Sequence, residues 1–211
     1  NYVNEWIFHE MAKEIGLIGL HYEFVNFNIN NQNKGLFVIE EGFSNNLLKK
    51  NNKRKGPIFG LNEDYEMKNF FEAKFDPYQL NFWLKKKNKT LFLEAKNKLS
   101  SLKDRSLNLE EIINVKMWAD YFVLCDILFS HHGALPKSVK FYYNPNSKLF
   151  EPIPFDGHKI PPYDYSPLIE DFFNHNTIFD IANKNSFKDQ NEKNFSEWLR
   201  LFFFKKDGNL N

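Results

Sequence analysis

Between Leu109 and Phe129 the chain is apolar on nearly every side of a helix. Aliphatic and aromatic residues recur there at almost all angular positions, so no continuous polar stripe remains. A helix that is apolar all round is buried at the centre of a domain. We therefore predict one central helix over residues 109–129, with the remaining elements packed around it.

The composition is that of a folded globular chain. Of the 211 residues, 42% are hydrophobic and 18% aromatic, which is enough apolar material for a sizeable core and argues against disorder. Lys and Arg number 28 against 27 Asp and Glu, so the net charge of +1 directs the chain neither to nucleic acid nor to an anionic membrane. No apolar run reaches the roughly 18 residues that a transmembrane segment needs.

The lone cysteine and the chain ends add two expectations. Cys125 has no second cysteine to join, which excludes an internal disulfide and a cysteine-based zinc site. The chain begins at Asn1 without an initiator methionine and stops in a loop-like stretch, so we expect it to be truncated at both ends.

Hydrophobic periodicity and turn signals predict an α+β fold. In chain order they predict a helix over 5–15, a hairpin over 21–39, a short apolar run at 57–61, a helix-prone region at 64–108, the central helix, a polar loop at 130–133, a hairpin over 139–153, and short helices at 167–173 and 195–204.

Asp156 is the carboxylate with the most distinctive position. It follows the second strand of the hairpin over 139–153 and precedes Gly157, a placement that can aim a side chain into a cleft. An Asp-Gly pair after a strand is also an ordinary turn, and the local pattern does not separate the two. The order of a buried helix, a polar loop, a hairpin and then Asp156 resembles the catalytic-loop and metal-aspartate arrangement of protein kinases.

Polar residues near this aspartate are the other candidates for chemistry. His131, His132 and His158 fall on the two loops that such an arrangement brings together. Their spacing matches no zinc signature, so a proton-shuttling or phosphate-contacting histidine and a histidine with no role both remain open. Asp126, an acid near the end of the apolar helix, must be paired there, and it is either a site residue or a structural cap.

A basic stretch at 49–55 allows two interpretations. It is either a solvated loop or a phosphate-binding patch, in which Lys55 would contact nucleotide phosphate or an acidic substrate. No glycine-rich phosphate loop accompanies it.

Several stretches together resemble the CotH kinase family, the atypical protein kinases named for a spore-coat protein. In chain order they are WIFHEMAKEIGL (6–17), VNFNIN (25–30) with KGLFVIEE (34–41), RKGPI (54–58), and WADYF (118–122) followed by FYYNP (141–145) and LFEPIPFD (149–156). The motifs G-[LI]-[YF]-x-[LI]-x-E and [IL]-P-[WF]-D of that family occur here in the expected order.

The resemblance implies an atypical protein-kinase-like fold that binds ATP and Mg²⁺ or Mn²⁺. It implies a single domain over 1–211, with an incomplete small lobe at 1–62 and a mostly helical large lobe at 63–211. Asp156 would be the metal ligand, and Glu40 or Glu41 would lie at the edge of the nucleotide cleft. Relatives of this kind are often exported or associated with the cell envelope of bacteria.

Two departures from the family pattern affect the expected mechanism. The family has a catalytic Asp followed by a metal-holding Asn, whereas the corresponding loop 130–138 of this chain contains neither residue type. His132 stands near the position of the catalytic Asp, and Ser138 takes the place of the Asn. The strand that would carry a phosphate-binding Lys or Arg would precede Asn1. We therefore expect a kinase acting on a protein Ser/Thr or another surface-associated hydroxyl, in which His132 takes the acceptor proton and Asp126 is the second candidate for this role. The alternative is a catalytically inactive, pseudokinase-like binding or assembly module.

Overall fold

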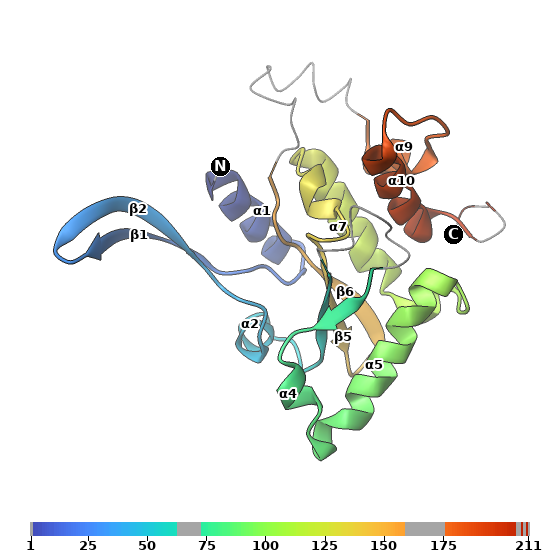
Figure 1. Cartoon of the computed structure of the whole chain (residues 1–211), viewed down its shortest axis with the longest axis horizontal. Coiled ribbons are helices and arrows are strands. Elements are labelled where there is room, and N and C mark those ends of the chain that lie inside the picture. Colours follow the sequence, from blue (N-terminus) through green and yellow to red (C-terminus); the bar gives the residue numbers. More distant parts are fainter. Residues whose placement is uncertain (1, 63–72, 159–175, 206–207, 209, 211) are drawn as a thin grey trace.

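The computed structural model describes residues 2–62, 73–158, 176–205, 208 and 210, and within them the α+β class is confirmed (Figure 1). The helices are α1 (Tyr2–Glu14), α2 (Asn45–Lys50), α4 (Leu80–Trp83), α5 (Lys86–Asp104), α6 (Leu109–Ile112), α7 (Val115–Ile127), the 3₁₀ helix η1 (His131–Ala134), α9 (Ile178–Asn183) and α10 (Gln190–Phe203). The strands are β1 (Tyr22–Ile29), β2 (Gln32–Glu40), β3 (Ile58–Leu61), β4 (Phe75–Pro77), β5 (Lys140–Asn144) and β6 (Leu149–Ile153).

Helix α1 and the β1–β2 hairpin confirm the prediction for the first forty residues. Gly16 ends the helix with a φ of +82°, a left-handed conformation that glycine adopts without strain. The hairpin turn is tighter than the Asn-rich sequence suggests, because Asn30 and Asn31 take φ values of 49° and 62° and form a two-residue connection. The hairpin projects from the body as a two-stranded ribbon (Figure 1).

The second sheet has four antiparallel strands in the order β4-β3-β5-β6. Its β5–β6 hairpin was predicted from the sequence, whereas β4 lies in a region that we expected to be helical. Strand β3 precedes the expected lobe boundary at 62/63 but pairs with β5, in register Ile58 with Tyr142. This sheet therefore joins the first third of the chain to the segment that ends at Asp156.

The prediction of one helix over 109–129 is wrong, because the chain breaks at Ile113 and Asn114. Asn108 begins α6 with a capping box, and the Asn114 side chain accepts a hydrogen bond from the backbone N–H of Met117 to begin α7. Between them Ile113 is extended and bridges to Phe150 of β6. Within this apolar stretch, Asn114 was not recognised as the cap of a second helix, whereas Asn108 caps the first helix at its predicted start.

Helix α7 is nevertheless central. Trp118 and Tyr121 are almost completely buried, and the Trp118 ring stacks on Phe202 of α10 at a centroid separation of 4.6 Å. Phe8 of α1 packs against Tyr121 from the other side, at 6.4 Å. The apolar character is not uniform, since Val123 is 55% exposed. Helix α7 is therefore amphipathic enough to keep one edge in water.

The remaining predictions have mixed outcomes. The helix expected at 195–204 is confirmed and begins earlier, at Gln190, because the Asp189 side chain caps it. The region at 64–108 contains α4 and the long helix α5, while residues 63–72 lie outside the described part of the chain. The helix expected at 167–173 also lies outside it. Among the described residues, no helix combines the length and the apolarity needed to cross a bilayer.

Candidate active site

The loop that carries His132 is held in place by three side chains. Tyr121 of α7 donates a hydrogen bond to the carbonyl of Gly133, and the Trp198 indole of α10 donates one to Ala134 O at 2.9 Å. Ser130 Oγ donates to the carbonyl of Gly157 at 3.0 Å, which ties this loop directly to the one that follows β6. The 3₁₀ turn η1 is thus fixed against both the core and the Asp156 segment.

The segment Asp156-Gly157-His158 turns sharply at the end of β6. Asp156 has a φ of 59°, in the left-handed region that Asp tolerates better than most residues, and its carbonyl accepts the His158 N–H at 2.8 Å. Gly157 lies directly against Phe8 of α1, where an added Cβ would overlap the ring. The Asp-Gly pair is therefore a turn, and that turn presents the Asp156 carboxylate to the neighbouring loop.

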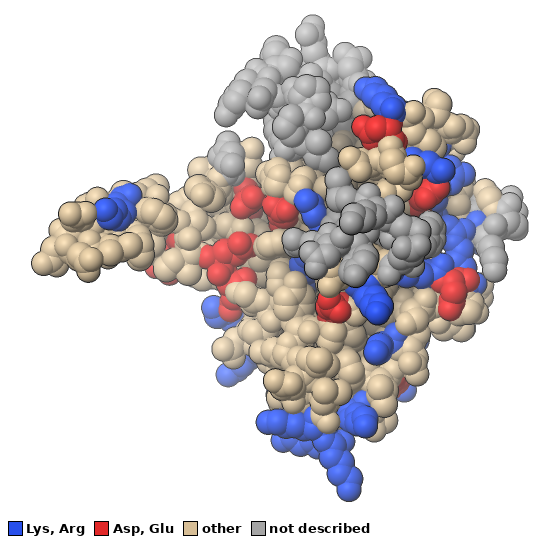
Figure 2. Space-filling view, in the orientation of Figure 1, with Lys and Arg blue, Asp and Glu red and all other residues tan. Residues whose placement is uncertain are grey.

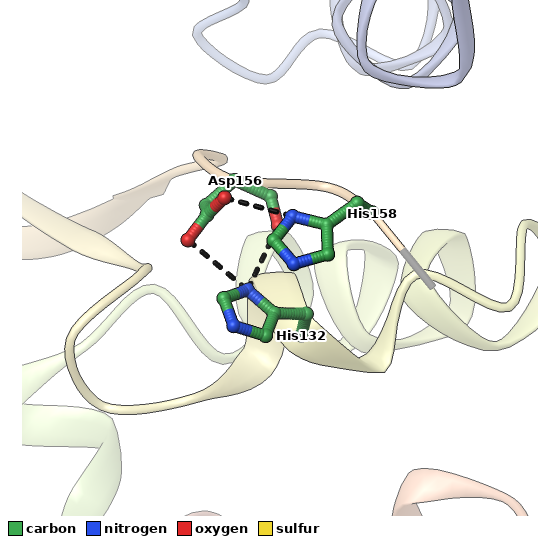
Figure 3. A group of neighbouring side chains, drawn as sticks. All are labelled: His132, Asp156 and His158. Atoms are coloured by element: carbon green, nitrogen blue, oxygen red, sulfur yellow. Dashed lines mark hydrogen bonds and ion pairs between the residues drawn. The ribbon is translucent and has the colours of Figure 1, made fainter. Parts of the chain in front are cut away.

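Two histidines converge on the Asp156 carboxylate (Figure 3). His132 Nδ1 lies 3.0 Å from Oδ2, and His158 Nδ1 lies 2.8 Å from Oδ1. The two imidazole rings stack with centroids 3.8 Å apart. Ser138, which is fully buried, donates from Oγ to Asp156 Oδ2 at 3.4 Å. Of the three histidines singled out on the two loops, His132 and His158 therefore form one cluster with Asp156, whereas His131 pairs with Asp126.

The Asp156 carboxylate is held in its ionised form. Partial burial would raise its pKa, but the hydrogen bond from His132 and the positive charges of His132, His158 and Lys137 outweigh burial and lower it. An ionised carboxylate beside imidazole nitrogens has the chemistry to hold a divalent cation, and His132, Asp156 and His158 each offer one ligand atom within 4.8 Å of the others.

Further acidic groups surround this cluster from α1 and the hairpin. Glu5 Oε1 lies 3.6 Å from His158 Nδ1, and its Oε2 accepts the Tyr22 hydroxyl at 3.0 Å. The pKa of Glu40 is raised by partial desolvation and by the nearby carboxylates of Glu5 and Asp156, although a hydrogen bond with Tyr22 opposes the change. Figure 2 shows Asp and Glu side chains gathered where the hairpin joins the body.

The other predicted residues have partners elsewhere. Glu41 forms an ion pair with Lys50 of α2 at 3.0 Å. Asp126 accepts from the Ile178 N–H and lies against His131 Nε2, both at 2.9 Å, so it joins the end of α7 to the start of α9. None of its contacts among the described residues reaches Asp156.

The basic stretch is likewise attached to the surrounding structure. The Lys55 amine lies 3.6 Å from the centroid of the Phe82 ring on α4, a cation–π contact. Lys53 forms an ion pair with the buried Glu151 of β6 at 2.7 Å. These contacts agree with a structural loop, and they do not join Lys55 to the Asp156 cluster.

The structure adds residues to which the sequence assigned no definite role. His158 could be placed near Asp156 by its position two residues further on, but its contact with Glu5 depends on a residue over 150 positions away in the chain. Tyr22 and Glu5 carried no motif that pointed to the site. Their involvement follows from the packing of α1 against the loop after β6.

A hairpin that brings an ionised aspartate against the loop at the end of a buried helix is an arrangement of the protein-kinase class. The family model described as CotH kinase protein matches residues 1–160, and the chain belongs to this family. The match supports a kinase-like function at the level of the family. A search of curated proteins found no match to this chain.

Proposed function

We propose that this protein transfers the γ-phosphoryl group of ATP to a protein Ser/Thr or to another surface-associated hydroxyl, with the help of Mg²⁺ or Mn²⁺. The observation that carries the proposal is the Asp156 carboxylate, kept ionised between two imidazoles at the junction of two loops. When bound, the cation would neutralise phosphate charge during transfer. Asp156 is the residue that would hold it.

His132 is our candidate for the proton of the acceptor hydroxyl. Its Nδ1 faces the acceptor atoms Asp156 Oδ2 and Asp156 O, at 3.0 and 3.3 Å, so this nitrogen carries the proton when the ring is neutral. The other ring nitrogen, Nε2, then has a free lone pair, and it points away from Asp156 (Figure 3). That arrangement favours His132 over Asp126, whose oxygens are engaged by His131 and α9.

The nucleotide would lie between the hairpin base and the Asp156 loop. The electrostatic influence of Asp156 on Glu40 supports a position of Glu40 at the edge of that cleft, as the family resemblance implies. The ion pair of Glu41 with Lys50 makes Glu41 the weaker candidate of the two. Contact of Lys55 with phosphate would require it to leave the Phe82 ring.

A second candidate, from a different functional class, is an assembly or binding module that keeps the kinase fold without turnover. The composition of the loop 130–138 favours it, because no Asp or Asn stands there. The test is transfer from γ-labelled ATP to mixed protein acceptors, comparing the wild type with Asp156→Asn and His132→Asn.

The substituted asparagine at 132 keeps a donor near the position of Nδ1 but removes Nε2. We expect transfer by the wild type to depend on the cation, to be lost in Asp156→Asn, and to fall by about 10²- to 10⁴-fold in His132→Asn. If the wild type transfers no phosphoryl group with Mg²⁺ and none with Mn²⁺, the enzyme proposal is overturned and the assembly module is favoured.

A further inference from the structure

The two oxygens of Asp156 face different surroundings. Oδ2 is approached by His132 Nδ1 at 3.0 Å and by the Ser138 hydroxyl at 3.4 Å, and both groups can donate a proton to it. Oδ1 is approached by His158 Nδ1 at 2.8 Å. Oδ2 therefore has two hydrogen-bond donors from the loop 130–138, whereas Oδ1 is contacted by His158.

His158 Nδ1 is placed between carboxylates from two separate elements. Asp156 Oδ1 from the loop after β6 lies at 2.8 Å, and Glu5 Oε1 from α1 lies at 3.6 Å. The His158 side chain is 36% exposed, so an ion can reach it from solvent. At this separation and without a metal, Nδ1 donates its proton to the ionised oxygen. A divalent cation that displaced this proton would bind between the nitrogen and the oxygen, which would then form a chelating pair.

The spacing fits two ligands of one ion. Ligand atoms about 2.1 Å from a metal and at right angles to each other are about 3.0 Å apart, close to the 2.8 Å observed here. The carboxylates of Glu5 and Glu40 add negative charge beside Asp156, which favours a cation, although Lys137 adds positive charge nearby. Among the described residues, no Lys or Arg forms an ion pair with Glu5, Glu40 or Asp156.

We propose that His158 Nδ1 and Asp156 Oδ1 ligate the divalent cation together, and that the nitrogen ligand makes the site prefer Mn²⁺ over Mg²⁺. Mg²⁺ is bound mainly through oxygen, whereas imidazole ligands suit first-row transition metals. His158 thereby supplies a second ligand in a chain whose loop 130–138 has no Asn. The inference rests on the proposed function for the identity of the site, but cation binding is measurable without nucleotide.

The test measures direct binding of Mn²⁺ without nucleotide. The electron paramagnetic resonance signal of the free ion monitors this binding, and Mg²⁺ is added as a competitor. His158→Ala removes the nitrogen, and His158→Asn places an amide oxygen near the position of Nδ1. His21→Gln is the matched control, because His21 is an exposed histidine that precedes β1. All proteins are used without a histidine tag.

We expect His158→Ala to weaken Mn²⁺ binding by about tenfold or more, since even indirect partners of a metal contribute on this scale. His158→Asn should reduce the preference for Mn²⁺ over Mg²⁺, and His21→Gln should bind Mn²⁺ like the wild type. Circular dichroism melting checks that each variant is folded.

Two results would overturn the inference. Unchanged Mn²⁺ affinity in His158→Ala, with binding lost in Asp156→Asn, would remove His158 from the site and leave the proposed function standing. Equal affinity of the wild type for Mn²⁺ and Mg²⁺ would remove the preference, and the transfer assay with Mg²⁺ would then judge the proposed function separately.

Discussion

His132 Nδ1 lies 3.0 Å from Oδ2 of Asp156, although 24 residues separate the two in the chain. The contact joins the turn after α7 to the turn after β6. A buried aromatic residue holds each of these two turns. Tyr121 donates a hydrogen bond to the turn after α7, and Phe8 packs against the turn after β6. The geometry of the candidate site therefore depends on core packing, and substitutions in the core should change both stability and binding.

Tyr121→Phe should destabilise the protein by about 1–3 kcal/mol, because it leaves the buried carbonyl of Gly133 without its hydroxyl donor. The adjacent His132 loop should loosen, so cation binding at Asp156 should weaken as well. Tyr142→Phe is the matched control: its hydroxyl donates to Arg54 O, away from this loop. Urea denaturation should show a comparable loss of stability in both variants, and only Tyr121→Phe should affect cation binding.

Gly157→Ala should disturb the site through a steric clash. An added Cβ would overlap the Phe8 ring, so α1 or the Asp156 turn must shift. We expect a loss of about 1–3 kcal/mol, as for other overpacked positions, together with weakened cation binding. Gly42→Ala has free space around the new Cβ and should change neither property. Equal behaviour of the two variants in thermal melts would contradict the packing described for Gly157.

His9 should make the protein sensitive to acid. Burial and the nearby Lys13 lower the pKa of His9 from 6.5 to about 3. Between these values the unfolded chain binds a proton that the folded protein excludes, so stability falls as the pH falls from 6.5 towards 3. The limiting slope is about 1.4 kcal/mol per pH unit.

His9→Asn tests this dependence. The Asn side chain can accept the Leu20 N–H in place of Nδ1 but does not titrate. Urea midpoints measured across this pH range should fall less steeply for the variant than for the wild type, whatever its absolute stability. Parallel curves for the two proteins would show that His9 takes up its proton without unfolding.

Asp126→Ala should reduce stability by about 1–3 kcal/mol, since the Ile178 N–H and His131 both lose their partner. Cation and ATP binding should stay unchanged, because the contacts of Asp126 within the described part of the chain do not reach the Asp156 cluster. Asp120→Ala on the same helix breaks an exposed pair with Lys116 and should cost about 0.5 kcal/mol or less. Loss of ATP binding in folded Asp126→Ala would return this residue to the list of catalytic candidates.

Local patterns predicted those elements whose signals lie within one stretch of chain. The 3.6-residue spacing of α1, the alternation of the first hairpin and the turn between β5 and β6 are of this kind. The single helix over 109–129 was wrong because Asn114 looks like one polar residue in an apolar run, while structurally it caps a new helix. Strand β4 was missed because only its pairing with β3 defines it.

The candidate site was predictable in part for the same reason. Asp156 and His132 could be singled out because motif order places their two loops together. Glu5, and the contact of His158 with it, depend on how α1 packs, and no local pattern encodes that distance. Asp126 was singled out because a buried acid needs a partner, and the structure identifies that partner as His131 and the N-terminus of α9.

Isothermal titration of ATP, with and without a divalent cation, tests the central claim about Asp156 most directly. The account predicts that the wild type binds ATP in the presence of Mn²⁺ or Mg²⁺, binds it much more weakly without the cation, and loses the cation-dependent part in Asp156→Asn. ATP affinity that is the same in Asp156→Asn as in the wild type would contradict the account.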